Sequence, residues 1–418
     1  MKRRTIENIC GVVLSVNLLL LTGCGQYVIG TNDPEEAKTS VFKIIEDVSS
    51  KVSDVTSLIS DYSPNIDIET TLAEEGKKPI PPETNQERFK DCYVYNTLSE
   101  EEQIAYSEIY DCIMDFKEST VLNTEDIQIA TKAANAILSD HGGIFWIDGY
   151  GYTSWTDPDT NEILYIEFAP NYTMTKEEKD IYQTDIDTEV DNILASLSQD
   201  ADDYEKIKYF YETLIKTVAY DKNSTHNQNI ISVFINKSTV CKGYTNAMQY
   251  LLSKVDIPCT IVTGLANGES HAWNLVKLDG DYYYVDTTWG NPSFLNEEKP
   301  EGYIDYKYLN VTTEDLNKTH ESAESFELPE CTATDDNYYV REGLYFTEFS
   351  EDAVGNIFKT ALEENLVDIS VRFSNSTAFS EMCAAFIDNQ KIFDYCPNLR
   401  GISYTEDSDN NIFTLFLA

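Results

Sequence analysis

The sequence has few of the residues that usually bind transition metals. It contains only four histidines, and no CxxC, HxxH or HExxH spacing occurs among its 418 residues. Protein zinc sites are usually built from cysteines and histidines at such short spacings. We therefore predict no metal site, and nothing in the sequence indicates another cofactor.

Positive charge is also scarce. Lysine and arginine together number 30 against 73 aspartates and glutamates, which gives a formal net charge of -43 at pH 7. A chain with this charge repels the phosphates of DNA and RNA. The composition therefore argues against nucleic acid as a partner, and an acidic, well-solvated surface is enough to explain it.

Apolar runs long enough to cross a membrane are missing beyond the start of the chain. At the start, Lys2 to Arg4 precede an apolar run from Ile9 to Leu21, which is typical of an export signal. The Leu-Thr-Gly-Cys stretch ending at Cys24 resembles the processing site of bacterial lipoproteins. That resemblance implies cleavage before Cys24 and a lipid anchor at the outer face of the bacterial cell membrane. An ordinary secretory signal, in which Cys24 has no role, is the alternative.

The nine cysteines show no spacing of a disulfide framework. Cys10 would leave with the signal and Cys24 would carry lipid, so seven remain in the mature chain. An odd number leaves at least one thiol outside any disulfide within the chain. Cys112 and Cys383 fall in apolar helical patterns, so we interpret them as small buried residues. The disulfide status of the others stays open.

At 418 residues the chain is long for a single hydrophobic core. The KKPIPP stretch at 77–82 is typical of an extended linker, and the acidic, irregular stretch at 312–336 indicates a second boundary. We predict the following parts: a signal peptide at 1–23, a tether, helix and linker at 24–88, an N-terminal α+β region at 89–199, a core at 200–311 and a small α/β domain at 337–418.

Periodic apolar residues predict the helices and strands of these parts. Ser99 and Glu102 form a capping box that begins one helix. Further helices are predicted over 35–60, after Thr124, and over 175–197, 202–217, 351–363 and 377–389. Strands are predicted over 143–152, 163–169, 369–373 and 412–418.

Cys241 stands at the start of another predicted helix. One face of this helix is apolar and carries Tyr244, Ala247, Met248, Leu251, Leu252 and Val255. The unpaired backbone N–H groups and the dipole at a helix start favour an anion, which lowers the pKa of a thiol there. The same N–H groups can stabilise an oxyanion. This position suits a nucleophile better than a core residue.

Residues 271–286 have the pattern of a β-hairpin with Asp279-Gly280 as its two-residue turn. Residue 278 then pairs with residue 281, which places His271, Trp273, Asp286 and Thr288 on one face. We predict that Asp286 accepts the Nδ1–H of His271 and leaves Nε2 for the thiol. A three-residue turn would put the histidine and the aspartate on opposite faces. A structural histidine and a turn-forming aspartate are the alternatives.

Three segments together resemble the transglutaminase-like superfamily of papain-like cysteine enzymes: YETLIKTVAYD, VCKGYTNAMQYLL and HAWNLVKLDGDYYYVDTTW. Bacterial members commonly show Cys-x-Gly-Tyr, His-Ala-Trp-Asn and Asp-x-Thr-Trp in this order, and the match covers about residues 200–295. The resemblance implies an α+β fold with a papain/transglutaminase-like core. It also implies Cys241 as the nucleophile, His271 as the general base and Asp286 as the residue that orients it.

The resemblance extends to residues around these three. Gly243 and Tyr244 match the segment after the nucleophile, although tight packing alone would explain them. Trp273 and Trp289 also match, and each can be either a wall of the cleft or part of the core. Gln228 is a candidate oxyanion donor in addition to the backbone N–H of the nucleophile.

The resulting hypothesis is acyl transfer through a thioester. The Cys241 thiolate would attack a carboxamide or peptide carbonyl, and His271 would protonate the departing amine. Attack by water would make the protein a peptidase or amidase, whereas attack by an amine would make it a transamidating enzyme. The expected substrates are surface proteins or peptides, including cell-wall peptides. The alternative is a catalytically inactive binding or scaffold lipoprotein.

Overall fold

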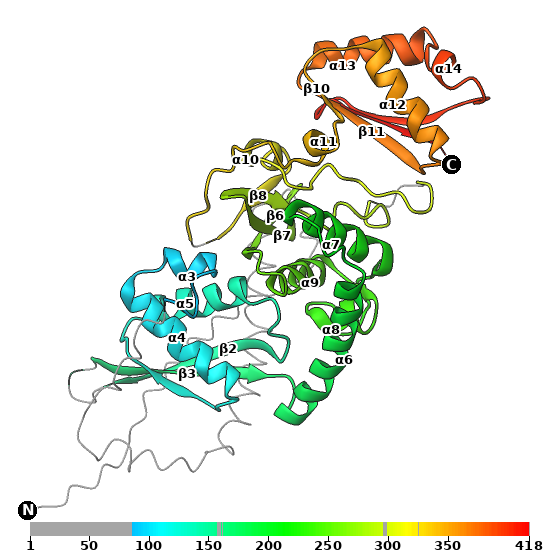
Figure 1. The fold of residues 1–418 in the computed structure, drawn as a ribbon. Coiled ribbons are helices and arrows are strands. Elements are labelled where there is room, and N and C mark those ends of the chain that lie inside the picture. The colour runs from blue at the N-terminus through cyan, green and yellow to red at the C-terminus, as the bar shows by residue number, and fades with distance from the viewer. Residues whose placement is uncertain (1–85, 157–159, 161, 296–298, 325, 418) are drawn as a thin grey trace, which may run out of the picture. The chain divides into compact units, whose positions relative to one another are not determined.

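The computed structural model describes residues 86–156, 160, 162–295, 299–324 and 326–417 (Figure 1). The predicted signal peptide, Cys24, the helix over 35–60 and most of the linker lie outside these residues. No helix within the described ranges is both long enough and apolar enough to cross a membrane.

The N-terminal region combines three helices with an antiparallel sheet. The helices are α3 (Tyr93–Thr97), α4 (Glu100–Met114) and α5 (Ile127–Asp140), and the strands β1 (Thr120–Leu122), β2 (Ile147–Thr156) and β3 (Ile163–Tyr172) pair in the order β1-β3-β2. Helices α4 and α5 lie side by side next to this sheet (Figure 1). The predicted capping box at the start of α4 is confirmed, because Ser99 and Glu102 each bond the other's backbone N–H.

The strand predicted over 143–152 begins later than expected, at Ile147. The apolar residues before it, Phe145 and Trp146, are 0% and 4% exposed, but they reach the core from a loop. Phe145 and Trp146 are therefore buried, but the prediction that the strand begins at residue 143 is wrong.

Four helices and one parallel pair of short strands follow. They are α6 (Lys176–Ala195), α7 (Asp203–Thr217), α8 (Ile230–Phe234), α9 (Cys241–Ser253), β4 (Ala219–Tyr220) and β5 (Ser238–Thr239). The expected apolar face of α9 is buried in the main core, and its members within the helix, Tyr244, Ala247, Met248, Leu251 and Leu252, are all 0% exposed. This burial orients α9 and thereby the residue at its first position.

The core sheet has the order β8-β7-β6-β9 and is antiparallel throughout. Its strands are β6 (Cys259–Ala266), β7 (Glu269–Leu278), β8 (Asp281–Val285) and β9 (His320–Ser322). The predicted two-residue turn is confirmed: Leu278 pairs with Asp281, and Asp279 and Gly280 have φ of 51° and 97°. Positive φ at both central residues is typical of the hairpin turn that keeps the strands in register.

The ladder between β7 and β8 ends at the pair Asn274–Val285. The expected pairing of His271 with Thr288 therefore does not form, because residues 287–290 make a turn. Asp286 lies between the end of the strand and that turn.

Residues 312–336, expected to be a boundary, belong in part to the core sheet. This stretch contains α10 (Thr313–Leu316) and β9, and β9 pairs with β6 through Ala266 and His320. A three-residue strand is too short to show an alternating pattern, which is why the sequence did not reveal it.

The C-terminal region has its own four-stranded sheet, in the order β10-β11-β13-β12, and its own apolar core. Its elements are α11 (Tyr338–Arg341), β10 (Tyr345–Phe346), α12 (Glu351–Glu363), β11 (Asp368–Phe373), α13 (Ser376–Cys383), a π-helical turn η1 (Ala384–Asp388), α14 (Ile392–Tyr395), β12 (Ser403–Asp407) and β13 (Ile412–Phe416). The helix predicted over 351–363 has these bounds in the structure, whereas the one over 377–389 changes to π geometry after Cys383.

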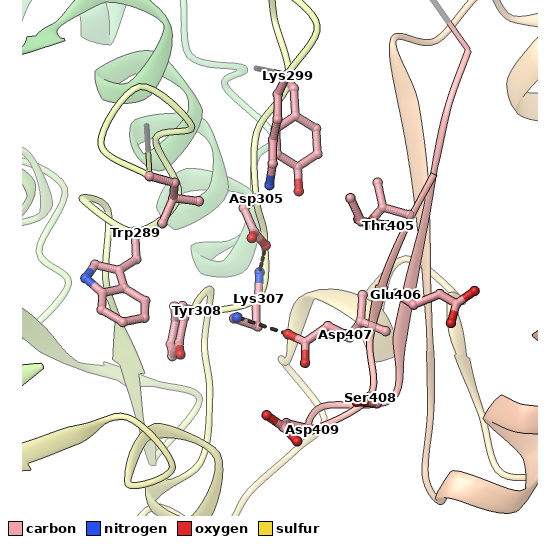
Figure 2. A pocket seen from close by; sticks show the side chains of 14 residues that line it. Trp289, Lys299, Asp305, Lys307, Tyr308, Thr405, Glu406, Asp407, Ser408 and Asp409 are labelled. Carbon is pink, nitrogen blue, oxygen red and sulfur yellow. Dashed lines mark hydrogen bonds and ion pairs between the residues drawn. The ribbon is translucent and has the colours of Figure 1, made fainter. Parts of the chain in front are cut away.

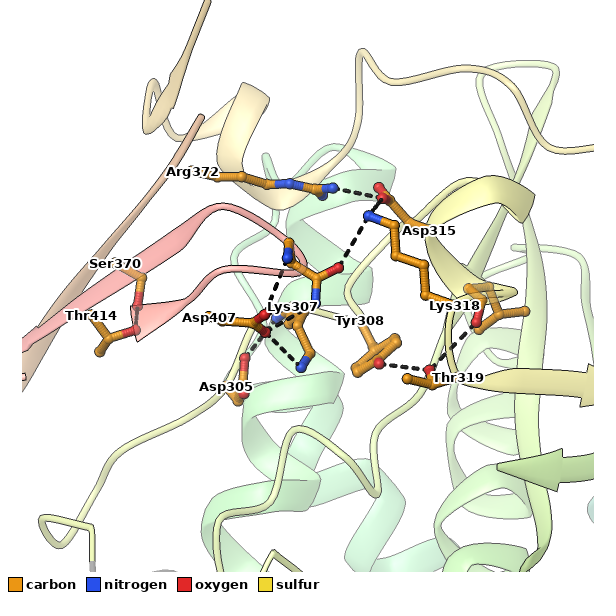
Figure 3. Close-up of polar contacts among 12 residues, drawn as sticks. Asp305, Lys307, Tyr308, Asp315, Lys318, Thr319, Ser370, Arg372, Asp407 and Thr414 are labelled. Carbon is orange, nitrogen blue, oxygen red and sulfur yellow. Dashed lines mark hydrogen bonds and ion pairs between the residues drawn. The ribbon is translucent and has the colours of Figure 1, made fainter. Parts of the chain in front are cut away.

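Polar contacts join this C-terminal sheet to the segment that precedes β9. Lys307 pairs with Asp407 at 3.0 Å, and Arg372 pairs with Asp315 at 2.6 Å (Figure 3). The Arg372 side chain is 11% exposed and that of Asp315 is 21% exposed. The second pair is therefore the more shielded of the two links.

Candidate active site

Cys241 is the first residue of α9 and is 3% exposed. The N-cap position is Val240, which offers no side chain to bond the N–H groups of the first turn, and that turn carries no acidic residue. Its backbone dipoles are therefore not offset by a local carboxylate. The predicted location of Cys241 at a helix start is confirmed, and this is the electrostatic setting in which a thiolate is favoured.

Gly243 allows the start of α9 to pack closely against β5. A Cβ built at Gly243 would overlap Oγ1 of Thr239, which itself lies 2.6 Å from Oγ of Ser232. The match of this glycine to the family segment therefore has a packing explanation.

Helix α9 is joined to β7 just behind the site. Oγ1 of Thr245 lies 2.9 Å from the carbonyl oxygen of Cys241 and 3.0 Å from that of Ala272. In return, the side-chain amide of Asn274 donates to the carbonyl oxygen of Thr245 at 3.1 Å. These bonds hold the turn that contains Cys241 against the strand that contains His271.

The structure brings His271 and Asp286 together in a buried contact. Nε2 of His271 lies 2.8 Å from Oδ2 of Asp286, and the two side chains are 3% and 0% exposed. The prediction that Nδ1 makes this contact is wrong. Asp286 lies beyond the last ladder pair, so the imidazole reaches it with the nitrogen farther from the backbone. Nδ1 is then the nitrogen left for a nucleophile.

Asp286 also forms the turn that follows β8. Its Oδ1 accepts from the backbone N–H groups of Thr288 and Trp289, at 2.9 and 3.2 Å. Burial alone would raise the pKa of this carboxyl, but the charges and hydrogen bonds of His271 and His320 outweigh burial. The pKa of Asp286 is therefore held well below its ordinary value, and the group is a carboxylate at neutral pH.

His320 is a second histidine at this carboxylate, and the sequence analysis missed it. Its Nε2 lies 3.2 Å from Oδ2 of Asp286, its Nδ1 lies 2.8 Å from Oγ1 of Thr319, and its side chain is 0% exposed. The acidic, irregular pattern of residues 312–336, which include His320, predicts a domain boundary. The scarcity of histidine, with four in the whole chain, was the one signal that pointed to His320.

His271, Asp286 and His320 form the one group within the described residues whose ligand atoms could share a metal ion, since these atoms all lie within 4.8 Å of one another. The same atoms already bond one another, at 2.8 and 3.2 Å. Hydrogen bonding accounts for this arrangement, and we assign no metal to it.

The two tryptophans have different environments. Trp273 is 1% exposed and packs in a buried cluster with Val262 and Leu275, so it belongs to the core. Trp289 is only partly buried and borders a hollow of about 330 Å³ that His271 also lines. Trp289 therefore borders the open space beside His271, and Trp273 lies in the core.

Trp289 and Leu295 also border a second hollow of about 410 Å³. Figure 2 shows Trp289 and Tyr308 on one side of it, and residues 405–409, at the end of β12 and the loop that follows, on the other. The indole of Trp289 therefore separates the space beside His271 from a space bordered by the C-terminal sheet.

Gln228 lies just before α8. Its backbone carbonyl accepts from the side-chain amide of Asn246 on α9 at 3.0 Å, and its own Nε2 lies 3.0 Å from Oδ1 of Asn227. These contacts connect Gln228 to the helix that begins at Cys241, and its role as an oxyanion donor stays a prediction.

The other thiols of the described chain are poor nucleophiles. None of its seven cysteines forms a disulfide. Burial raises the pKa of Cys112 to about 12 and that of Cys331 and Cys383 to about 11. Cys92 and His141 lie 3.9 Å apart, and both groups are neutral at neutral pH, because burial raises the pKa of the thiol and lowers that of the imidazole to about 3.

A family model described as the transglutaminase-like superfamily matches residues 191–287. The match begins within α6 and ends two residues after β8. It contains Cys241, His271 and Asp286, whereas His320 lies outside it.

Two curated relatives match part of the chain. The kyphoscoliosis peptidase of Homo sapiens is 24% identical over 135 residues, which are 28% of this chain and 20% of that protein. The kyphoscoliosis peptidase of Mus musculus is 22% identical over 127 residues, 26% of this chain and 19% of that protein. The chain therefore matches about a fifth of the length of each.

Solved structures match at low sequence identity. A crystal structure of a TGase has 15% identity over 30% of this chain and 41% of its own, with a TM-score of 0.25. A candidate cysteine protease from Cytophaga hutchinsonii has 16% identity over 45% of this chain and 67% of its own, with a TM-score of 0.24. Both scores are low, and the likeness to the transglutaminase-like superfamily is a likeness of sequence over residues 191–287.

Proposed function

We propose that this chain, a member of the transglutaminase-like superfamily through residues 191–287, is a cysteine-dependent acyl-transfer enzyme. The observation that carries the proposal is the buried hydrogen bond between His271 and Asp286, on a sheet that Thr245 joins to the first turn of α9. An imidazole held by a carboxylate is the usual base for a thiol at a helix start.

In the proposed reaction, the sulfur of Cys241 forms a bond to the carbonyl carbon of a peptide or carboxamide, and the proton of the thiol passes to Nδ1 of His271. The imidazolium then gives this proton to the departing amine as the carbon–nitrogen bond breaks, which leaves a thioester. Water or a second amine attacks the carbonyl carbon of the thioester, and its proton passes to His271. The carbon–sulfur bond then breaks, the proton passes from His271 to the sulfur, and the acid or the new amide leaves. The carboxylate of Asp286 stabilises the imidazolium at each stage.

Two groups would stabilise the oxyanion of the tetrahedral intermediate. The backbone N–H of Cys241 is one, because it belongs to the first turn of α9. The side-chain amide of Gln228 is the other proposed donor. Its bond to Asn227 would have to open when substrate binds.

The proposed substrates are proteins or peptides, with Trp289 and Phe294 bordering the space beside His271 that would receive the side chain next to the reacting carbonyl. We further propose that Cys24 carries lipid and holds the enzyme at the outer face of a bacterial membrane. Surface proteins and cell-wall peptides would then be the acyl donors within reach.

A catalytically inactive binding or scaffold protein is the second candidate. The observation that favours it is burial, since Cys241 is 3% exposed and His271 is 5% exposed. If Cys241 never becomes accessible to a substrate, it serves only as a packed core residue of an inactive protein.

Alkylation of Cys241 by iodoacetamide separates the two candidates. The enzyme predicts fast labelling below about pH 8.5, the ordinary thiol pKa, with much slower labelling in His271→Ala. Cys331→Ser is the matched control, because it removes a different buried thiol. If Cys241 is labelled as slowly as Cys331, the scaffold is the better account. In a second assay, incorporation of a dansylated amine would indicate transamidation, and fragments from a peptide library would indicate hydrolysis.

A further inference from the structure

Two histidines share one face of the core sheet although their strands are not neighbours. On β6, Gly264 pairs with His271 of β7, and Ala266 pairs with His320 of β9. Residues directly opposite one another lie on the same face, so only a glycine and an alanine separate the two imidazoles. Their ring centroids are 5.6 Å apart.

Gly264 is needed for this arrangement. A Cβ built there would overlap the carbonyl oxygen of Glu321 on β9 and lie 2.8 Å from the ring of Trp273. The ring of Trp273 in turn meets that of His320 edge to face, with centroids 4.9 Å apart. The sheet thus has space for His320 only because its central strand carries no side chain at this point.

Both imidazoles bond the same carboxylate oxygen. Oδ2 of Asp286 lies 2.8 Å from Nε2 of His271 and 3.2 Å from Nε2 of His320. An ionised carboxylate only accepts hydrogen bonds, so each of these nitrogens carries a hydrogen. His320 is therefore a donor to Asp286, whichever charge it carries.

A chain of hydroxyls lies behind His320. Oγ1 of Thr319 lies 2.8 Å from Nδ1 of His320 and 2.7 Å from the hydroxyl of Tyr308 (Figure 3 shows the Tyr308–Thr319 bond). This contact holds the ring of His320 at the nitrogen that does not face Asp286.

The other titratable groups near Asp286 are two phenols, Tyr308 from the loop before α10 and Tyr211 from α7. Burial raises the pKa of both above the ordinary value, so both are neutral at neutral pH. Neither phenol therefore adds charge beside Asp286.

We infer that His320 is a positioning residue of the active site. It acts as a hydrogen-bond donor that holds Oδ2 of Asp286 beside Nε2 of His271, which leaves Nδ1 of His271 for the thiol of Cys241. This inference rests on the proposed function. The proposed role of His320 is exerted through Asp286.

The test compares variants of the full-length exported protein, with iodoacetamide as the probe of Cys241 across a range of pH. His320→Leu removes the hydrogen-bond donor and puts an apolar side chain of similar size in its place. His320→Gln keeps an N–H close to the position of Nε2. Ser322→Ala, on the same strand but exposed, is the matched control.

In His320→Leu we expect labelling at neutral pH to slow about 10- to 100-fold, as for loss of a hydrogen bond to a charged group. The pH of half-maximal labelling should rise by about one unit, because a tenfold weaker thiolate–imidazolium pair corresponds to one pKa unit. His320→Gln should recover most of the rate, and Ser322→Ala should match the wild type. Thr319→Val should also slow the labelling of Cys241, by a smaller factor than His320→Leu. If His320→Leu does not fold, Thr319→Val still tests whether the contacts of His320 matter.

The outcomes separate this inference from the proposed function. Slow labelling of Cys241 in the wild type would contradict the proposed function itself. Fast labelling in the wild type, with the same rate and pH profile in folded His320→Leu and Thr319→Val, would show that His320 only fills space. Equal losses in His320→Leu and His320→Gln would also contradict a role as hydrogen-bond donor.

Discussion

The hydroxyl of Thr245 on α9 lies 3.0 Å from the carbonyl oxygen of Ala272 on β7. The hydroxyl oxygen of Thr245 also lies 2.9 Å from the carbonyl oxygen of Cys241. Its one hydrogen can be donated to either carbonyl. One side chain therefore connects the helix turn that begins at Cys241 with the residue after His271. The two segments are far apart in the chain, and this hydrogen bond joins them.

Replacing Thr245 by valine should loosen that connection while keeping the shape of the side chain. We expect iodoacetamide labelling of Cys241 to slow about 3- to 10-fold and the free energy of unfolding to fall by about 1 kcal/mol, as for one lost hydrogen bond. The control is Thr217→Val, which loses a similar bond to the carbonyl of Thr213 at the exposed end of α7. If iodoacetamide labels Cys241 at the same rate in both variants, the hydroxyl of Thr245 does not position Cys241 and the residue only packs.

Replacing Asp286 by asparagine should change both stability and its dependence on pH. At neutral pH we expect the free energy of unfolding to fall by about 3 kcal/mol, because the hydrogen bonds of a buried carboxylate to His271 and His320 are weakened. The folded pKa of Asp286 lies below the unfolded value of about 3.9, so its contribution is complete above about pH 4 and is lost as the pH falls further.

Urea unfolding of the wild type and Asp286→Asn at several pH values checks this sign. The difference between the two proteins should become smaller as the pH falls below about 4. Asp281→Asn, an exposed change on the same strand, serves as the control. A difference that grows with acidity would mean that burial, and not the histidines, controls this carboxyl.

The two tryptophans should differ when each is replaced by phenylalanine. Neither indole N–H makes a hydrogen bond within the described structure, so each change removes volume and no bond. Trp273→Phe should cost about 1–3 kcal/mol of unfolding free energy, because it leaves a cavity in a closed core. Trp289→Phe should cost less than about 1 kcal/mol, since the hollows beside it are already open.

Thermal unfolding of the two tryptophan variants, followed by calorimetry, measures this difference. If Trp289→Phe were the more destabilising change, Trp289 would be a core residue and not a wall of the cleft.

Cys24→Ala should release the protein from the membrane fraction, because the proposed anchor is the acyl group on this cysteine. Cell fractionation and immunoblotting measure the distribution. Cys10→Ala, within the proposed signal, should leave the protein in the membrane fraction. Retention of Cys24→Ala in the membrane fraction would count against lipidation at this residue.

Several features of the site follow from local sequence chemistry. The helix start at Cys241 was predictable because its apolar spacing is regular. The hairpin was predictable because Asp279-Gly280 suits positive φ at both positions, and the turn length then sets which residues pair. These properties depend on residues that are near one another in the chain, and they persist whatever packs around them.

The packing of distant segments decided the remaining features. His320 is on a three-residue strand whose place beside β6 no pattern in residues 312–336 reveals. The contact through Nε2 of His271 depends on where the ladder ends, and the different environments of Trp273 and Trp289 depend on what covers each ring.

The sequence by itself determined which residues can carry the chemistry, because side-chain type, helix starts and turn geometry are local properties. The tertiary structure alone decided which nitrogen meets Asp286, that a second histidine bonds the same carboxylate oxygen, and which tryptophan borders open space. The reason is physical: hydrogen-bond geometry between segments tens of residues apart is set by the burial of the apolar faces that bring them together.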